Sequence, residues 1–326
     1  MQKIFLTHNQ QMRKLRDDKH IECRDSSCKE ILCRTGYFNL VNGYKEAFVA
    51  SKGTNGNHVY HSGTSLHEMN ALKEFDDELR ALLQRQITKI EEEVRTVVAY
   101  KFDEANDRGK IAWYQIEAYN PKNNAAKIMR VISNAYRDVE LSQQEYVSYY
   151  LAHHKFIPTW IMVKVISFSH FINLVNSSKD AVKQAVCKLY GIMDASGKCN
   201  YKLLSGSLPW FRIVRNACAH NERIYTLSAP DSRIRMQYMD LLSASYKRSK
   251  DKTIMDLIVY MKYYSPHKEY CKFIENINHL ILSLQGDLHP TAFDNVRAAL
   301  GIKDLTHLHE LCKNPKEINY NKLSKM

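Results

Sequence analysis

The chain has 326 residues, of which 44% are hydrophobic and 25% are charged, and both shares are ordinary for a globular protein. Its 11 glycines and 7 prolines are too few for a turn-rich β-sandwich or barrel. The net charge of +12 and the isoelectric point of about 9.2 favour polyanionic partners, in practice nucleic acid, although a basic surface can also serve solubility alone.

The eight cysteines indicate a reduced protein. They form no Cys-x-x-Cys pair, and the five-residue spacing of Cys23, Cys28 and Cys33 matches neither a zinc knuckle nor a disulfide framework. The sequence has no signal peptide and no apolar run of about 18 residues. We therefore expect a cytoplasmic protein with no membrane partner, no cofactor and no metal, whose cysteines are buried as apolar residues.

Two short helices are predicted near the N-terminus. Thr7 can cap a basic amphipathic helix that ends near Lys19. A second helix starts at Asp25 or Ser26 and stops at Gly36, because glycine readily leaves the helical conformation.

The segment 37–63 is predicted to contain packing aromatics followed by a loop. The aromatic cluster at 37–48 suits the core better than base stacking, since aromatic residues at these spacings mostly pack. The glycine-rich loop that follows has a possible hairpin at 55–56. The nearby histidines (His58, His61 and His67) lack the cysteines or carboxylates that would complete a metal site there.

The longest predicted helix begins at the capping box formed by Ser65 and Glu68, and its apolar spacing continues to about Phe102. Ser142 and Glu145 form a second capping box sequence. Further helices are expected at 123–137, 142–153, 160–175 and 177–190, with 160–175 as the buried centre of a bundle.

The C-terminal third is also helical in pattern, with helices predicted at 233–246, 253–264, 269–284 and 292–300. The predicted fold class is therefore all-α. Three regions are expected: an N-terminal helical and loop region (1–62), a helical bundle (63–228) and a C-terminal helical region (229–326).

The stretch 208–225 carries the residues that point to chemistry. Pro209 suits the first turn of a helix, where its missing N–H has no partner in any case. If one helix runs through the stretch, Asn216, His220 and Arg223 share one stripe of its surface. A solvated helix face more often mixes Glu and Lys than Asn, His and Arg.

Arg215 lies five residues before His220 and can reach the edge of this stripe, or the same stripe on a second subunit. Ala217 and Ala219 would let another helix come close. An imidazole can transfer a proton and a guanidinium can bind phosphate, and the group contains no set of metal ligands. This combination suits metal-independent cleavage of an RNA phosphodiester.

The run Arg-Asn-Ala-Cys-Ala-His-Asn-Glu-Arg at 215–223 resembles the Arg-Asn-x-x-x-His signature of HEPN domains, in the form carried by abortive-infection (Abi) proteins of the AbiD/AbiF type. Three other parts of the chain also resemble that family, in the family's order. They are a tyrosine-and-glycine motif, a first long helix and a middle motif, at 36–44, at 75–80 with 90–95, and at 158–160.

The resemblance implies a HEPN-type bundle, a homodimer whose two signatures face each other, and RNA as substrate, with a small structured RNA as a further partner. It implies that His220 is the general acid or base. Arg215 would stabilise the phosphate, and Asn216 would orient the imidazole or the phosphate. Arg223 and Arg95 would add RNA contacts.

Lys247 and Arg248 begin a basic turn that can contact the RNA backbone or simply be a solvated loop. The favoured function is a metal-independent endoribonuclease of an antiphage or toxin system that leaves 2′,3′-cyclic phosphate ends. One alternative is a non-catalytic protein that holds a small structured RNA. The other is a scaffold whose polar cluster only stabilises a helix.

Overall fold

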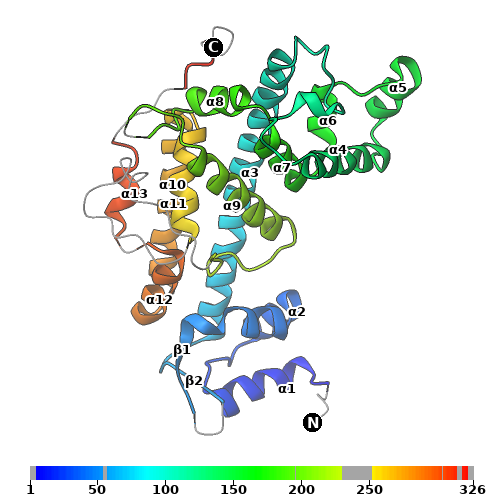
Figure 1. The fold of residues 1–326 in the computed structure, drawn as a ribbon. Helices are drawn as coiled ribbons and strands as arrows, with labels where there is room; N and C mark the ends of the chain where they lie inside the picture. The colour runs from blue at the N-terminus through cyan, green and yellow to red at the C-terminus, as the bar shows by residue number, and fades with distance from the viewer. Residues whose placement is uncertain are drawn as a thin grey trace.

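The computed structural model describes residues 5–53, 57–194, 196–229, 252–302, 304–313 and 318–321. Within these ranges the chain is all-α apart from one two-stranded sheet, as the sequence predicts. The long helix α3 (Leu66–Ala105) runs through the molecule from an N-terminal unit, which contains α1, α2 and the two strands, at one end to a group of shorter helices at the other (Figure 1).

The N-terminal unit confirms both predicted helices. The first is α1 (His8–Arg13), which continues as a π-helical turn (Lys14–Asp18) and is capped by Thr7 in a capping box with Gln10. The second is α2 (Ser26–Thr35), which stops because Gly36 has a φ of 74°. Strands β1 (Val49–Lys52) and β2 (His58–Tyr60) pair in an antiparallel sheet, whereas the residues of the predicted turn, 55–56, lie outside the described residues.

Helix α3 is the element around which the others pack. Ser65 accepts the N–H of Glu68 at 3.1 Å and donates its own N–H to the Glu68 carboxylate at 2.8 Å, so the predicted capping box is confirmed. The helix contains 40 residues without glycine or proline and runs without a break. It is about 60 Å long at a rise of about 1.5 Å per residue. Several helices later in the chain pack against it, among them α6, α8, α9 and α11.

Five helices follow in the middle of the chain: α4 (Ala125–Glu140), α5 (Glu145–His154), α6 (Thr159–Val165), α7 (Phe168–Ser177) and α8 (Asp180–Leu189). The capping box predicted for α5 is wrong, because Gln144 occupies the cap position and makes no side-chain cap bond. The single helix predicted at 160–175 is also wrong. Ser167 accepts the N–H of His170 at 3.2 Å and starts a new helix there.

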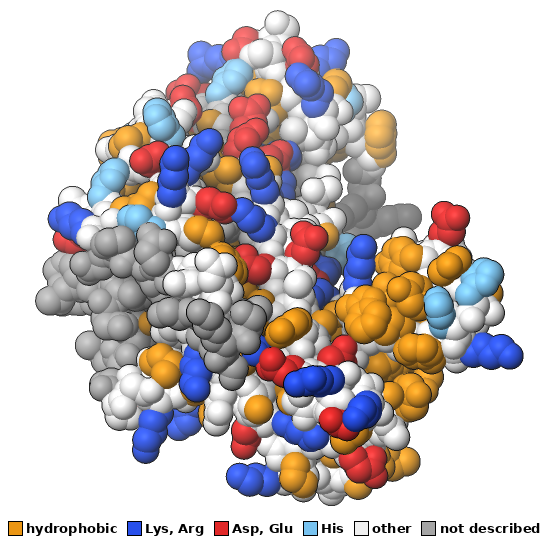
Figure 2. All heavy atoms as spheres, turned by 90° about the horizontal axis from the view of Figure 1, so that it is seen from above, with side chains coloured by type: hydrophobic (Ala, Val, Ile, Leu, Met, Phe, Trp, Pro, Cys, Tyr) orange, Lys and Arg blue, Asp and Glu red, His pale blue; other side chains and the backbone are white. Residues whose placement is uncertain are grey.

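The segment 160–175, predicted as the buried centre of the bundle, is partly exposed to solvent. Trp160 has 55% of its surface exposed, and hydrophobic side chains gather on the face over α4, α5 and α6 (Figure 2). We call this face the apolar patch, defined by Met129, Tyr136, Tyr149, Leu151, Phe156 and Trp160. An exposed group of this kind is typical of a surface that meets a partner.

Helix α9 (Tyr201–Ala219) begins earlier and ends earlier than predicted. Pro209 lies inside the helix rather than in its first turn, where it removes the N–H that would bond to the carbonyl of Ser205. The C-terminal helices are α10 (Ile254–Tyr264), α11 (His267–Asp287), α12 (Pro290–Leu300) and α13 (Thr306–Glu310). They confirm the helices predicted at 253–264, 269–284 and 292–300, whereas 233–246 lies outside the described residues.

Buried residues from all three predicted regions form one contiguous hydrophobic cluster. The boundaries at 62 and 228 stay predictions. The cysteines are free, and Cys23, Cys28, Cys187 and Cys218 are buried as expected, whereas Cys33 is exposed. None of the helices in the described ranges is long and apolar enough to cross a membrane.

Candidate functional site

His220 closes the C-terminal end of α9. Its backbone N–H bonds to the carbonyl of Asn216 at 3.0 Å, and Asn221 then takes a φ of 54°, which ends the helix. The N–H of Glu222 returns to the carbonyl of Ala217 at 2.9 Å, as in a Schellman cap. The imidazole of His220 is exposed and makes no hydrogen bond or ion pair within the described part of the chain, so it is free to meet a ligand.

The chain beyond His220 is held by a buried carboxylate of α3. Asp76 accepts the backbone N–H groups of Tyr225 at 2.8 Å and Ile224 at 3.2 Å. It also pairs with Arg80 at 2.8 Å and accepts the Tyr44 hydroxyl at 3.0 Å. Burial raises the pKa of the Asp76 carboxyl, while the two backbone N–H groups hold it down.

Sequence reasoning gave Asp76 no role. The available signal was its place four residues after Leu72 and three before Leu79, on the apolar stripe of the helix, where a charged residue needs a buried partner. The partner backbone lies 149 positions further along the chain.

A cleft of about 1240 Å³ opens beside His220. One wall is the turn at 220–228, another is α3, and the third is the segment 38–44 of the N-terminal unit. The cationic side chains that line it are Lys73, Arg80 and Arg223. Each of these cations pairs with a carboxylate: Lys73 with Asp77 at 2.6 Å, Arg80 with Asp76, and Arg223 with Glu46 at 3.4 Å.

A second cleft, of about 1210 Å³, lies on another side of the end of α9 and contains Arg215 and Ala219. Glu91 joins two guanidinium groups here, with Arg215 at 3.3 Å and Arg95 at 2.6 Å. Arg215 also donates to the side-chain oxygen of Asn216 at 3.0 Å. Gln84 lines both clefts, so the two meet at this point of α3.

Arg95 is buried rather than exposed to a ligand. Its guanidinium donates to the carbonyl of Val163 and lies over the ring of Phe171, 4.7 Å from the centroid. Burial lowers the pKa of Arg95, and the adjacent Glu91 opposes that effect. It lines the second cleft mainly as part of the support for Arg215.

The continuous helical stripe predicted for Asn216, His220 and Arg223 is wrong, because α9 ends at Ala219. Arg223 lies beyond the turn and donates to the carbonyl of Gly43 in the N-terminal unit. Arg215 and Asn216 are brought together, whereas Arg215 and His220 line different clefts. Lys247 and Arg248 lie outside the described residues.

These features define an all-α protein whose exposed imidazole lines one of two neighbouring clefts, each of which contains guanidinium groups paired with carboxylates. The chain belongs to the Abi-like protein family, whose sequence model matches residues 30–226 and so covers the lining of both clefts except Leu227 and Ser228. Membership associates it with abortive infection, the defence against phage for which the family is named. No curated protein and no solved structure matches the chain.

Proposed function

We propose that the chain is a HEPN-type endoribonuclease of the AbiD/AbiF kind, which cleaves RNA without a catalytic metal ion. The observation that supports this most directly is that the imidazole of His220 is exposed in a cleft and has no partner among the residues that the structure describes. An imidazole can take the proton of a 2′-hydroxyl or give one to the leaving 5′-oxygen. Attack by the 2′-oxygen leaves a 2′,3′-cyclic phosphate and a 5′-hydroxyl end.

In this mechanism Arg215 stabilises the extra charge that develops on the phosphate. Its guanidinium is held by Glu91 and by Asn216, so it is oriented before RNA arrives. Asn216 is then a positioning residue, which holds Arg215 rather than the phosphate. A phosphate oxygen can bind the guanidinium edge that these partners leave open, or displace Glu91.

A homodimer would supply what one chain lacks. General acid and base catalysis of this reaction uses two proton-transfer groups, and one chain presents a single imidazole in the cleft beside α9. Arg215 of the same chain lines the other cleft. A twofold axis near the exposed Ala219 would bring His220 of one chain toward Arg215 of its twin, with RNA between them.

Further RNA contacts are assigned to Arg223, Lys247 and Arg248, with Arg95 acting through its support of Arg215. The net charge of +12 favours such a partner. If RNA is the substrate, the protein would act in the cytoplasm, because cellular RNA is found there.

The test is cleavage of an end-labelled RNA in a buffer without added divalent cations, by the wild type and by His220→Ala. The wild type should produce fragments that polynucleotide kinase and phosphatase treatments identify as 5′-hydroxyl and 2′,3′-cyclic phosphate ends. His153→Ala is the matched control, because this histidine is also exposed but lies at the end of α5. His153→Ala should cleave as the wild type does, and cleavage that survives His220→Ala unchanged would contradict the assignment.

A second candidate function is RNA binding without chemistry, which is favoured by the presence of one histidine, His220, in the described lining of the first cleft. It predicts that the affinity for RNA falls at least about tenfold over a few-fold rise in salt concentration. The reason is that Lys and Arg side chains of the protein release counterions from the RNA when they bind its phosphates. It also predicts intact RNA after long incubation with the wild type. RNA that binds the dimer and stays uncut would favour this second function.

A further inference from the structure

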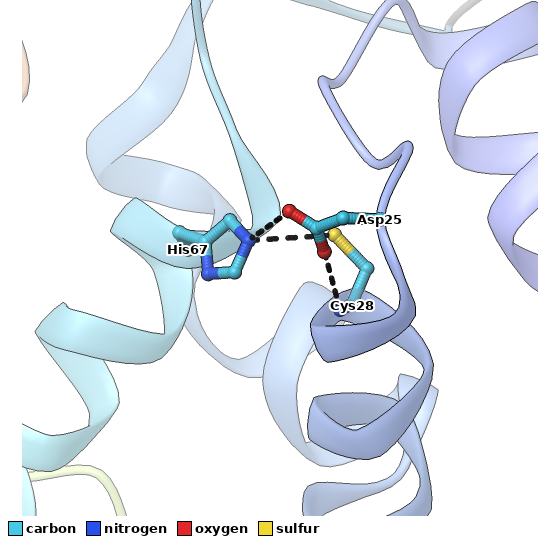
Figure 3. A group of neighbouring side chains, drawn as sticks. All are labelled: Asp25, Cys28 and His67. Carbon is cyan, nitrogen blue, oxygen red and sulfur yellow. Dashed lines mark hydrogen bonds and ion pairs between the residues drawn. The ribbon is translucent and has the colours of Figure 1, made fainter.

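A third group of chemically active side chains lies away from both clefts, where the start of α2 meets the start of α3 (Figure 3). Asp25 is the N-cap of α2, Cys28 lies in the first turn of that helix, and His67 lies in the first turn of α3. The Nε2 atom of His67 lies 3.2 Å from Oδ2 of Asp25 and 3.7 Å from Sγ of Cys28. All three ligand atoms lie within 4.8 Å of one another.

One ring nitrogen here faces more acceptors than it can serve. Besides Asp25 and Cys28, the hydroxyl of Ser27 lies 3.2 Å from Nε2 of His67. A single N–H can point at only one of these groups. A cation at their centre would interact with the nitrogen, the sulfur and the carboxylate together.

The separations fit a tetrahedral zinc ion. With Zn–S of about 2.3 Å and Zn–N and Zn–O of about 2.0–2.1 Å, a sulfur and a nitrogen ligand lie about 3.5 Å apart, and a nitrogen and an oxygen about 3.3 Å. The observed values are 3.7 Å between Cys28 and His67 and 3.2 Å between His67 and Asp25. A mixed thiolate and imidazole set prefers zinc to magnesium or calcium, which select oxygen ligands.

A second thiol stands next to the first. Cys23 is 1% exposed, like Cys28, and the two thiols interact. Asp25 and His67 have about half of their side chains exposed, so an ion could enter from solvent and meet the sulfurs on its inner side. The Asp25 carboxylate is held in place by the Ser27 hydroxyl, which donates to it at 2.5 Å, and by the backbone N–H of Cys28, which donates to it at 2.9 Å.

We propose that Asp25, Cys28 and His67 bind a structural zinc ion, and that Cys23, whose thiol meets Cys28 but lies outside this close group of three, moves in as the fourth ligand. The ion would join α2 to α3 and so fix the N-terminal unit on the long helix. That unit contributes residues 38–44 to the cleft of His220, so zinc would support one wall of the cleft without taking part in the chemistry. The zinc site does not depend on RNA cleavage.

The experiment uses the full chain without a polyhistidine tag, incubated with zinc sulfate and freed of unbound metal. Mass spectrometry of the metal should find one zinc per chain in the wild type. Loaded with cobalt instead, the protein should show the thiolate charge-transfer band and the strong visible bands of a tetrahedral site. Competition with a chromogenic chelator gives the affinity.

Three substitutions remove one ligand each: Cys28→Ser, His67→Gln and Asp25→Asn. Loss of an outer-shell partner alone costs about 10–100-fold in metal affinity, so loss of a direct ligand should weaken zinc binding at least about tenfold. Asp25→Asn is informative because asparagine caps helices as well as aspartate does, so α2 keeps its N-cap while the ligand charge is lost.

Cys33→Ser is the matched control, since Cys33 lies on the same helix and is exposed beside His8 at 3.3 Å. It should bind zinc as the wild type does, and circular dichroism should show equal helicity in all variants. The site would be overturned if the wild type took up no stoichiometric zinc. It would also be overturned if Cys28→Ser and His67→Gln bound zinc as tightly as the wild type. Unchanged affinity in Cys23→Ser would overturn the fourth ligand.

Discussion

The carboxylate of Asp76 accepts the backbone N–H of Tyr225 at 2.8 Å, although the two residues lie 149 positions apart. This bond fastens the chain five residues beyond His220 to α3. The same carboxylate neutralises Arg80, which lines the cleft of His220. The direction in which the candidate imidazole faces therefore depends on one buried side chain of another helix.

Replacing this carboxylate should lower stability strongly. We expect Asp76→Asn to destabilise the protein by about 3–5 kcal/mol, because it leaves the buried Arg80 with only the partly exposed Asp77 as a charge partner and puts an amide where only acceptors fit. Urea unfolding followed by circular dichroism measures the change. Glu78→Gln is the control, since Glu78 lies two residues further along α3 and is exposed, so the change should cost at most about 0.5 kcal/mol. Equal costs for the two would contradict the tether.

Glu91 should be the second sensitive carboxylate, since it joins Arg95 and Arg215. Glu91→Gln leaves the buried Arg95 without a counter-charge, and we expect a loss of about 3–5 kcal/mol in the free energy of unfolding. Glu92→Gln changes the neighbouring, exposed residue and should stay within about 0.5 kcal/mol of the wild type. If Glu91→Gln were as stable as Glu92→Gln, the ion pair between Glu91 and Arg95 would contribute little to the free energy of unfolding.

The proposed dimer can be tested at Ala219, which is small and exposed at the end of α9. Ala219→Trp should block the close approach of a second copy, so light scattering should report a dimer for the wild type and a monomer for the variant. Ser205→Trp adds the same side chain at another exposed position of α9 and should leave the dimer intact. A wild type that is monomeric at working concentration would contradict the arrangement of paired sites.

The contact between α10 and α12 can be tested with a pair of glycines. Gly301 has a φ of 80°, and a Cβ there would lie 2.2 Å from the hydroxyl of Thr253, the N-cap of α10. Gly301→Ala should therefore destabilise the protein by about 1–3 kcal/mol. Gly286 lies in α11 with open space around it, so Gly286→Ala should stabilise by roughly 0.4–1 kcal/mol. Thermal unfolding of both variants would show opposite shifts.

Local chemistry made much of the fold predictable. Ser65 and Glu68 start α3 by hydrogen bonds within one turn, and Gly36 stops α2 by its own backbone freedom, so both signals lie within a few residues. Ser167 carried a similar signal inside an apolar run, but apolar spacing at 160–175 continued across it and concealed the break. The all-α class follows from signals of this kind.

The arrangement of the site was decided by contacts between distant segments. The spacing of Arg215, Asn216 and His220 was readable in the sequence, and it identified the stretch that forms the end of α9. Only the folded chain separates Arg215 from His220 into two clefts, because the helix ends at Ala219 and Asp76 draws the following backbone to α3.

Contacts between distant segments also explain why the sequence did not indicate the role of Glu91 or the proposed zinc ligands. Glu91 meets Arg215 across 124 positions, and Asp25 meets His67 across 42, with a hairpin between them. Helix periodicity and capping act over three or four residues, so they report the elements and their faces. Ion pairs and ligand sets depend on which faces meet, and that is settled by packing around α3.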